Sequence, residues 1–127
     1  MINNETKDLV YVCSPLGAAS VEGIKRNMGM ARLYMEMVSK KYNCRAVAPH
    51  AILPVFLDDH IPKERALGLK FGLDLLRICK KVVVCGRTIS AGMKKEIELA
   101  EQLGIEVIYN DIPMPTRVKI KIEIEGD

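Results

Sequence analysis

Aromatic side chains are scarce in this chain, which has no tryptophan, two phenylalanines and four tyrosines. Apolar residues nevertheless make up 49 % of the sequence and charged residues 28 %, an ordinary balance for a globular protein. We therefore expect a core of valine, isoleucine, leucine and methionine. The length of 127 residues predicts a single domain over residues 1–127, large enough to bury roughly two thirds of its unfolded surface.

Long apolar runs and concentrated charge are also missing. No uninterrupted apolar stretch approaches the ~20 residues of a membrane-spanning helix, and the N-terminal residues lack the basic-then-apolar order of a signal peptide. The formal charge of +3 is dispersed along the chain, which does not favour nucleic-acid binding. We therefore expect a cytoplasmic protein whose partners include neither a membrane nor a nucleic acid.

Metal-binding and disulfide patterns are absent as well. The cysteines are Cys13, Cys44, Cys79 and Cys85, without any C-x-x-C spacing, and the two histidines are His50 and His60. This pattern does not favour a zinc site, and we expect neither a metal nor a cofactor. In a reducing compartment the cysteines are expected to be small, buried apolar side chains.

Strand and helix patterns alternate along the sequence. Continuous β-branched runs predict buried parallel strands, and apolar residues at helical spacing predict amphipathic helices. The expected strands are 9–13, 44–48, 82–85 and 105–109, and the expected helices are 20–41, 63–79 and 90–103. This order predicts an α/β fold of three layers, α/β/α, with a central parallel sheet of the flavodoxin or Rossmann-like kind.

Two details of this pattern concern helix ends and buried faces. Ser20 is expected to cap the first helix, and Gly104 to end the third. The second helix is expected to bury Leu67, Phe71, Leu75 and Ile78. Residues 49–62 contain three prolines and are too broken for a regular element, and a loop of this length is usually functional or a lid.

The C-terminal residues 113–127 form a separate feature. Strict alternation over 118–125 predicts an additional edge strand with one solvated face. The same strand is also suited to pairing with another subunit, because an unpaired apolar edge favours association. We therefore expect a homo-oligomer, a dimer or larger.

Glu96 is out of place in its predicted helix. A projection at ~100° per residue places Met93, Ile97, Ala100 and Leu103 along one apolar stripe, and Glu96 falls inside that stripe. An unpaired ionised carboxylate in apolar surroundings costs several kcal/mol or changes its pKa. Glu96 is therefore a candidate functional residue.

Three loops follow the carboxyl ends of the predicted strands, where open parallel sheets bind ligands. They are residues 14–19, 49–62 and 86–92. The last leads into a helix N-terminus, whose free N–H groups favour an anion such as phosphate. Ser90 alone is accounted for by helix capping, but Gly92 in the first turn costs ~1 kcal/mol relative to alanine. A missing side chain there would let a ligand approach the backbone.

The segment Ser90-Ala91-Gly92-Met93-Lys94-Lys95-Glu96, after Val82-Val83-Val84, resembles the signature of the nucleoside deoxyribosyltransferase superfamily, which includes the deoxynucleoside monophosphate N-glycosidases. Tyr11 and Cys13, at the end of the first strand, match it too. The runs Val-Tyr-Val-Cys-Ser-Pro-Leu, Ala-Pro-His-Ala-Ile-Leu-Pro-Val-Phe-Leu-Asp-Asp and Gly-Leu-Asp-Leu-Leu-Arg-Ile-Cys are similar to a small bacterial and phage-associated branch that carries no assigned substrate. The resemblance covers residues 9–109.

This resemblance implies a catalytic role for Glu96. The carboxylate would attack the anomeric carbon, expel the base and form a glycosyl ester that water or a second base resolves with retention. Tyr11 would position Glu96 by a hydrogen bond. Ser90 and the backbone around Gly92 would bind the sugar 5′ hydroxyl or a 5′-phosphate, to which Arg87 would add charge.

The resemblance leaves more than one candidate for the proton donor and for the remaining substrate contacts. The superfamily often uses an aspartate in or just before the helix that precedes the third strand, and Asp74 is the nearest match, with Asp58 and Asp59 as rivals. His50 would stack on or hydrogen-bond a base, although a structural role is equally open. Ser14 and Gly17 are candidate contacts in the first loop, which has one glycine and a proline that removes a donor.

The sequence thus favours a nucleoside or nucleotide N-glycosidase or deoxyribosyltransferase acting through a covalent glycosyl-glutamate. The alternative is a non-catalytic nucleotide-binding or nucleotide-sensing module on the same fold. A relation to phosphoribohydrolases is less favoured, because their G-G-x-G-T-x-x-E pattern is missing. The identity of the base, the sugar and the acceptor stays open.

Overall fold

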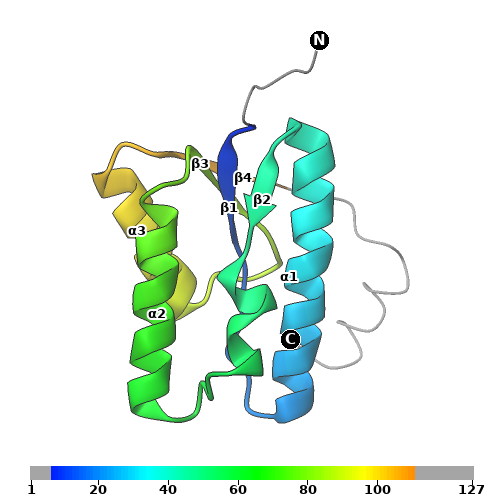
Figure 1. The fold of residues 1–127 in the computed structure, drawn as a ribbon, viewed down its shortest axis with the longest axis vertical. Helices are drawn as coiled ribbons and strands as arrows, with labels where there is room; N and C mark the ends of the chain where they lie inside the picture. Colours follow the sequence, from blue (N-terminus) through cyan, green and yellow to red (C-terminus); the bar gives the residue numbers. More distant parts are fainter. Residues whose placement is uncertain (1–6, 111–127) are drawn as a thin grey trace.

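The computed structural model describes residues 7–110. Strands and helices alternate along this part of the chain (Figure 1). In order they are β1 (Leu9–Cys13), α1 (Val21–Tyr42), β2 (Arg45–Val47), α2 (Pro62–Leu76), β3 (Lys81–Val84), α3 (Ala91–Gln102) and β4 (Glu106–Tyr109). The predicted alternation is confirmed, with boundaries that differ by up to three residues.

The strands form one parallel sheet in the order β2-β1-β3-β4. β1 lies in the interior of the sheet, so that Tyr11 is paired with Val47 of β2 on one side and with Val82 of β3 on the other. The prediction of an α/β fold with a central parallel sheet is therefore confirmed. An interior strand fixes its side chains firmly, because both of its edges are hydrogen-bonded.

Helices cover both faces of the sheet, with α1 on one face and α2 and α3 on the other (Figure 1). The core beneath α1 includes Val10, Val12, Ala31, Tyr34, Val38 and Val83. The core beneath α2 and α3 includes Tyr11, Cys13, Leu76, Val82, Met93 and Ile97. Because successive side chains of a strand point to opposite faces, Tyr11 and Cys13 both face the layer that contains Glu96.

The predicted helix ends are confirmed. The Ser20 hydroxyl accepts a hydrogen bond from the Gly23 backbone N–H at 3.0 Å and caps α1. Gly104 follows α3 with φ of 73°, a left-handed conformation that glycine adopts without steric cost. Gly86 also has a positive φ, 109°, at the point where the chain leaves β3 for the loop to α3.

The predicted buried face of α2 is wrong for Leu67, Phe71 and Ile78, whereas Leu75 is partly buried against the core. Leu67, Phe71 and Ile78 are 55 %, 50 % and 65 % exposed, and Gly72 and Leu76 are the buried residues of the helix. The glycines explain this orientation. A Cβ on Gly68 would lie 3.5 Å from Leu57, and one on Gly72 would lie 3.0 Å from the Tyr11 hydroxyl. α2 therefore packs against the molecule through its glycine side and presents large apolar residues outward.

The proline-rich segment between β2 and α2 is more regular than predicted. It contains two short 3₁₀ turns, η1 (Pro49–Ala51) and η2 (Leu53–Val55), with a proline in the first positions of each. Proline favours such starts because its φ is fixed and it needs no hydrogen-bond acceptor. The predicted strand within 113–127 lies outside the described residues. Among residues 7–110, no helix combines the length and apolarity needed to cross a membrane.

Candidate functional site

Glu96 is buried, as its position in the apolar stripe predicts. Its exposed fraction is 2 %, and Met93, Ile97 and Ala100 of the same helix are buried with it. Leu103, expected on that stripe, is 44 % exposed just after the helix ends. α3 has a polar face that is exposed to solvent, and yet it places the Glu96 carboxylate on its other face, toward the protein interior.

The Glu96 carboxylate is held by two side chains from β1. The Tyr11 hydroxyl donates to Oε2, and the Cys13 thiol donates to Oε1 at 3.3 Å. The two donors are two residues apart on one strand, so they lie on the same face and reach the two oxygens together. Hydrogen bonds that connect residues so distant in sequence fix the position of the carboxylate relative to the sheet.

Opposing influences act on the ionisation of this cluster. Burial raises the pKa of Glu96, whereas the charge of His50 and the hydrogen bonds from Tyr11 and Cys13 lower that pKa. Burial and the neighbouring carboxylate raise the pKa of Tyr11 well above its ordinary value and also raise the pKa of the Cys13 thiol. Tyr11 and Cys13 are therefore neutral donors at physiological pH, not nucleophiles.

Gly72 of α2 packs directly against this cluster. A Cβ at Gly72 would lie 3.0 Å from the Tyr11 hydroxyl and 3.5 Å from Glu96 Oε2. The α2 backbone therefore covers the tyrosine and carboxylate from one side. The absence of a side chain at position 72 allows this close approach.

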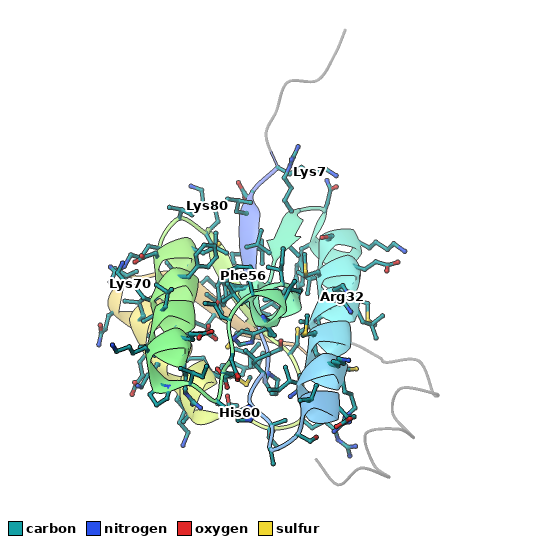
Figure 2. The ribbon with its side chains drawn as sticks, turned by 60° about the horizontal axis from the view of Figure 1, so that its bottom comes forward. Lys7, Arg32, Phe56, His60, Lys70 and Lys80 are labelled. Atoms are coloured by element: carbon teal, nitrogen blue, oxygen red, sulfur yellow. The ribbon has the colours of Figure 1, made fainter. Side chains whose placement is uncertain are left out.

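A cavity of about 330 Å³ lies at the carboxyl end of the sheet, and Glu96 contributes to its wall. Figure 2 turns this end of the molecule toward the viewer. The other polar lining residues are His50, Asp59, Glu64, Arg65, Ser90 and Lys95, and leucines such as Leu53 and Leu69 supply apolar wall. The volume and the mixture of apolar surface with a few polar groups are typical of small-molecule sites.

Several residues singled out by the sequence line this cavity. They are Gly17, His50, Asp59, Ser90, Gly92 and Glu96. Ser90 caps α3 by accepting a hydrogen bond from the Met93 N–H at 3.2 Å. A Cβ on Gly92 would meet no atom of the described chain within 4 Å. Protein packing therefore does not require glycine at position 92.

Ser14 and Arg87 lie outside the cavity wall. Ser14 is 1 % exposed, and its backbone oxygen is hydrogen-bonded to His50 Nδ1 at 2.7 Å. Within the described residues, its hydroxyl oxygen is buried without a hydrogen-bond partner. Arg87 is exposed in the loop after β3.

Asp74 and Asp58 do not lie beside Glu96 either. Asp74 is exposed and accepts from Lys70 at 2.6 Å, on the outer side of α2, where Figure 2 labels Lys70. The orientation of α2 explains this, because Gly72 occupies the side that faces the carboxylate. Asp58 is exposed and borders an adjoining groove beside α1, which shares Asp59 and Glu64 with the cavity. Of the three aspartates considered as proton donors, Asp59 is the one in the cavity wall.

Arg65, Lys95 and the role of Cys13 were missed by sequence reasoning. Arg65 lies 3.7 Å from the Asp59 carboxylate, and Lys95 precedes Glu96 on α3. Tyr11 and Cys13 are two residues apart on a buried strand and therefore lie on the same face. This spacing was sufficient to predict that Cys13 also faces Glu96. No comparable signal existed for Arg65, because its place in the wall depends on the orientation of α2.

The site is therefore a buried carboxylate held by two neutral donors, in a cavity whose wall carries both cationic and acidic side chains. Such an arrangement suits an attack on an electrophilic carbon of a bound ligand. Among residues 7–110, no three histidine, cysteine, aspartate or glutamate side chains are grouped to hold a metal ion.

Residues 8–110 match a protein family that is described as a domain of unknown function, DUF7768. The match covers the whole of the sheet and its helices, and the chain therefore belongs to this family. No curated protein matches the chain.

Proposed function

We propose that this protein is a nucleoside or nucleotide N-glycosidase, or a deoxyribosyltransferase, that acts through Glu96. One observation carries the proposal: a buried carboxylate, held by a tyrosine and a cysteine of the central strand, lines a cavity at the carboxyl end of a parallel sheet. The resemblance of residues 9–109 to the nucleoside deoxyribosyltransferase superfamily names the reaction.

In this reaction a Glu96 oxygen attacks the anomeric carbon as the bond to the base breaks. The sugar is held as a glycosyl ester until water or a second base replaces the glutamate. The Tyr11 hydroxyl holds the carboxylate and stabilises its charge both before the attack and after the ester is broken.

The beginning of α3 favours an anionic group on the substrate. Lys95 lies in the same wall as Ser90 and Gly92 of α3, whereas Arg65 in that wall lies 3.7 Å from the Asp59 carboxylate. Backbone N–H groups at a helix N-terminus favour negative charge. We assign the 5′ end of the sugar, as a hydroxyl or a phosphate, to this part of the wall.

The direct test is release of free base. The protein is incubated with deoxynucleosides, their 5′-monophosphates and ribonucleotides, and the products are separated by chromatography. Glu96→Gln should abolish the release that the wild type gives. Glu98→Gln, a change at an exposed position of the same helix, should leave it intact. Release by Glu96→Gln as fast as by the wild type would show that Glu96 is not the nucleophile.

The second candidate function is a nucleotide-binding or nucleotide-sensing module without catalysis. The 2 % exposure of Glu96 favours it, because a structural carboxylate would also be covered and hydrogen-bonded. Calorimetry combined with the base-release assay distinguishes the binding module from the enzyme. Heat of nucleotide binding without base release by the wild type would support the module, and base release would exclude it.

A further inference from the structure

We propose that His50 is the acid–base residue of the site, which protonates the departing base and then deprotonates the attacking water. This inference rests on the proposed N-glycosidase function. It assigns the proton transfer to a cavity residue for which sequence reasoning offered only base stacking, base hydrogen bonding or a structural role.

The orientation of the His50 ring is fixed by the backbone. His50 lies in η1, is half-buried and lines the cavity. Its Nδ1 lies 2.7 Å from the Ser14 backbone oxygen. A carbonyl oxygen only accepts, so Nδ1 carries the hydrogen in either ionisation state of the ring. Nε2 is then the nitrogen that gains or loses a proton.

The same strand end positions both His50 and Glu96. Ser14, which holds the imidazole, directly follows Cys13, whose thiol donates to Glu96. A positive charge on the His50 ring lowers the pKa of Glu96. The histidine and the carboxylate are therefore set at a fixed spacing in one cavity wall, as a proton donor and a nucleophile must be.

The carboxylates near the cavity already have partners. Asp59 lies 3.7 Å from the Arg65 guanidinium, and Glu64 Oε1 accepts from the Asp58 backbone N–H at 2.7 Å. Asp74 is paired with Lys70 outside the cavity. His50 is thus the lining residue whose chemistry best suits reversible proton transfer.

Both steps balance with His50 as acid and then base. In the first, a Glu96 oxygen bonds to C1′, the C1′–N bond breaks, and its electron pair stays on the base, which takes the proton from Nε2. In the second, a water oxygen bonds to C1′ and gives a proton to Nε2. The ester bond breaks with its electron pair returning to Glu96, so the cycle ends on a carboxylate and a protonated imidazole.

The test compares His50→Gln on two substrates that differ in their need for a proton. One is a purine deoxynucleoside monophosphate, and the other is its N7-methyl derivative, whose base departs as a neutral molecule without protonation. With protein in excess over substrate, base release in a single turnover is measured without a contribution from hydrolysis of the ester. Its rate in His50→Gln should fall at least about a hundredfold on the ordinary substrate and less than about tenfold on the methylated one. Thermal unfolding of the variant verifies that it folds.

His60→Gln is the matched control, because His60 is the other histidine of the chain and its exposed ring contacts the Ala18 backbone oxygen at 3.0 Å. It should cleave both substrates at the wild-type rate. An equal loss on both substrates in His50→Gln, or no loss on either, would overturn the assignment of His50. Absence of base release by the wild type would instead overturn the proposed function, and the assignment with it.

Discussion

At the scale of single residues, Glu96 is a carboxylate whose burial opposes its ionisation. Its folded-state pKa is raised from the ordinary value of 4.5, mainly by burial. A raised carboxyl pKa means that the folded state holds its proton at a pH where the unfolded chain has released it. The contribution of Glu96 to stability is therefore complete below pH 4.5 and is lost as the pH rises through the folded pKa.

Glu96→Gln should consequently change the pH dependence of stability. The amide has the shape of the carboxyl group and no charge, so the variant should gain free energy of unfolding relative to the wild type near pH 7. That gain should shrink toward zero below pH 4.5. Urea denaturation over a pH series measures it, with Glu98→Gln as a control that should show no such trend. A gain independent of pH would mean that ionisation of Glu96 is not its source.

Tyr11→Phe removes the donor of the hydrogen bond between Tyr11 and Glu96. The variant keeps the ring and removes the hydroxyl, which leaves Glu96 Oε2 buried with one donor fewer. We expect a loss of about 1–3 kcal/mol in the free energy of unfolding at neutral pH, together with a further rise in the pKa of Glu96. Tyr109→Phe, at a 61 % exposed tyrosine, is the control and should cost little.

A double-mutant cycle with Glu96→Gln sharpens this measurement. If Tyr11 and Glu96 stabilise one another, their two changes will not be additive. Strict additivity within about 0.3 kcal/mol would contradict a direct interaction.

At the scale of elements, the orientation of α2 decides which residues reach the site. A pattern of Leu67, Phe71 and Ile78 predicts that a helix forms, but it does not state which face is buried when glycines provide an alternative contact surface. This is why Asp74 was placed wrongly and Arg65 was missed. Glu96 could be predicted, because its helix has abundant polar positions elsewhere and no packing reason to bury a charge.

Gly72→Ala tests the close contact of α2 with the site. Alanine favours a helix over glycine by about 1 kcal/mol, but the new Cβ would lie 3.0 Å from the Tyr11 hydroxyl. We expect overpacking to dominate and lower the free energy of unfolding by about 1 kcal/mol or more. Gly29→Ala in α1, with no atom within 4 Å of the new Cβ, should instead be stabilising. Equal effects at the two positions would show that α2 adjusts freely.

Gly92→Ala separates ligand approach from folding. The new methyl group meets no described atom within 4 Å, so the thermal unfolding temperature should be unchanged or higher. Because position 92 lines the cavity, base release or nucleotide affinity should fall by about tenfold or more, the effect of about 1.4 kcal/mol of lost binding. Undiminished activity would place the ligand away from the beginning of α3.

At the scale of the whole molecule, the fold could be predicted more completely than the site. Continuous runs such as 9–13 and 81–84 fit a sheet that is covered on both faces, and the breaks between them fit the connections. The cavity depends on how η1, η2 and α2 pack beyond the strand ends. His50 is oriented by the backbone of Ser14, 36 residues earlier, and no spacing in the sequence predicts such a contact.

The predicted burial of the four cysteines is confirmed. The rate at which their thiols are modified therefore measures how readily the protein opens. Burial raises the pKa of Cys79 to about 11 and of Cys85 to about 12, so the native thiols are shielded and also poorly ionised. Ellman's reagent at pH 8 should modify the native protein at least about a thousandfold more slowly than the denatured chain. The reagent reaches a buried thiol only after local or global unfolding, which costs several kcal/mol.

The order of modification, read by peptide mass spectrometry, carries the sharper prediction. Cys44 and Cys79 lie beside the ends of elements and are 6 % and 5 % exposed, whereas Cys13 and Cys85 are 0 % and 1 % exposed at the carboxyl ends of β1 and β3. Cys44 and Cys79 should therefore react first. Earlier reaction of Cys13 would mean that the region around Glu96 opens before the rest of the molecule, which contradicts a site held rigid by β1.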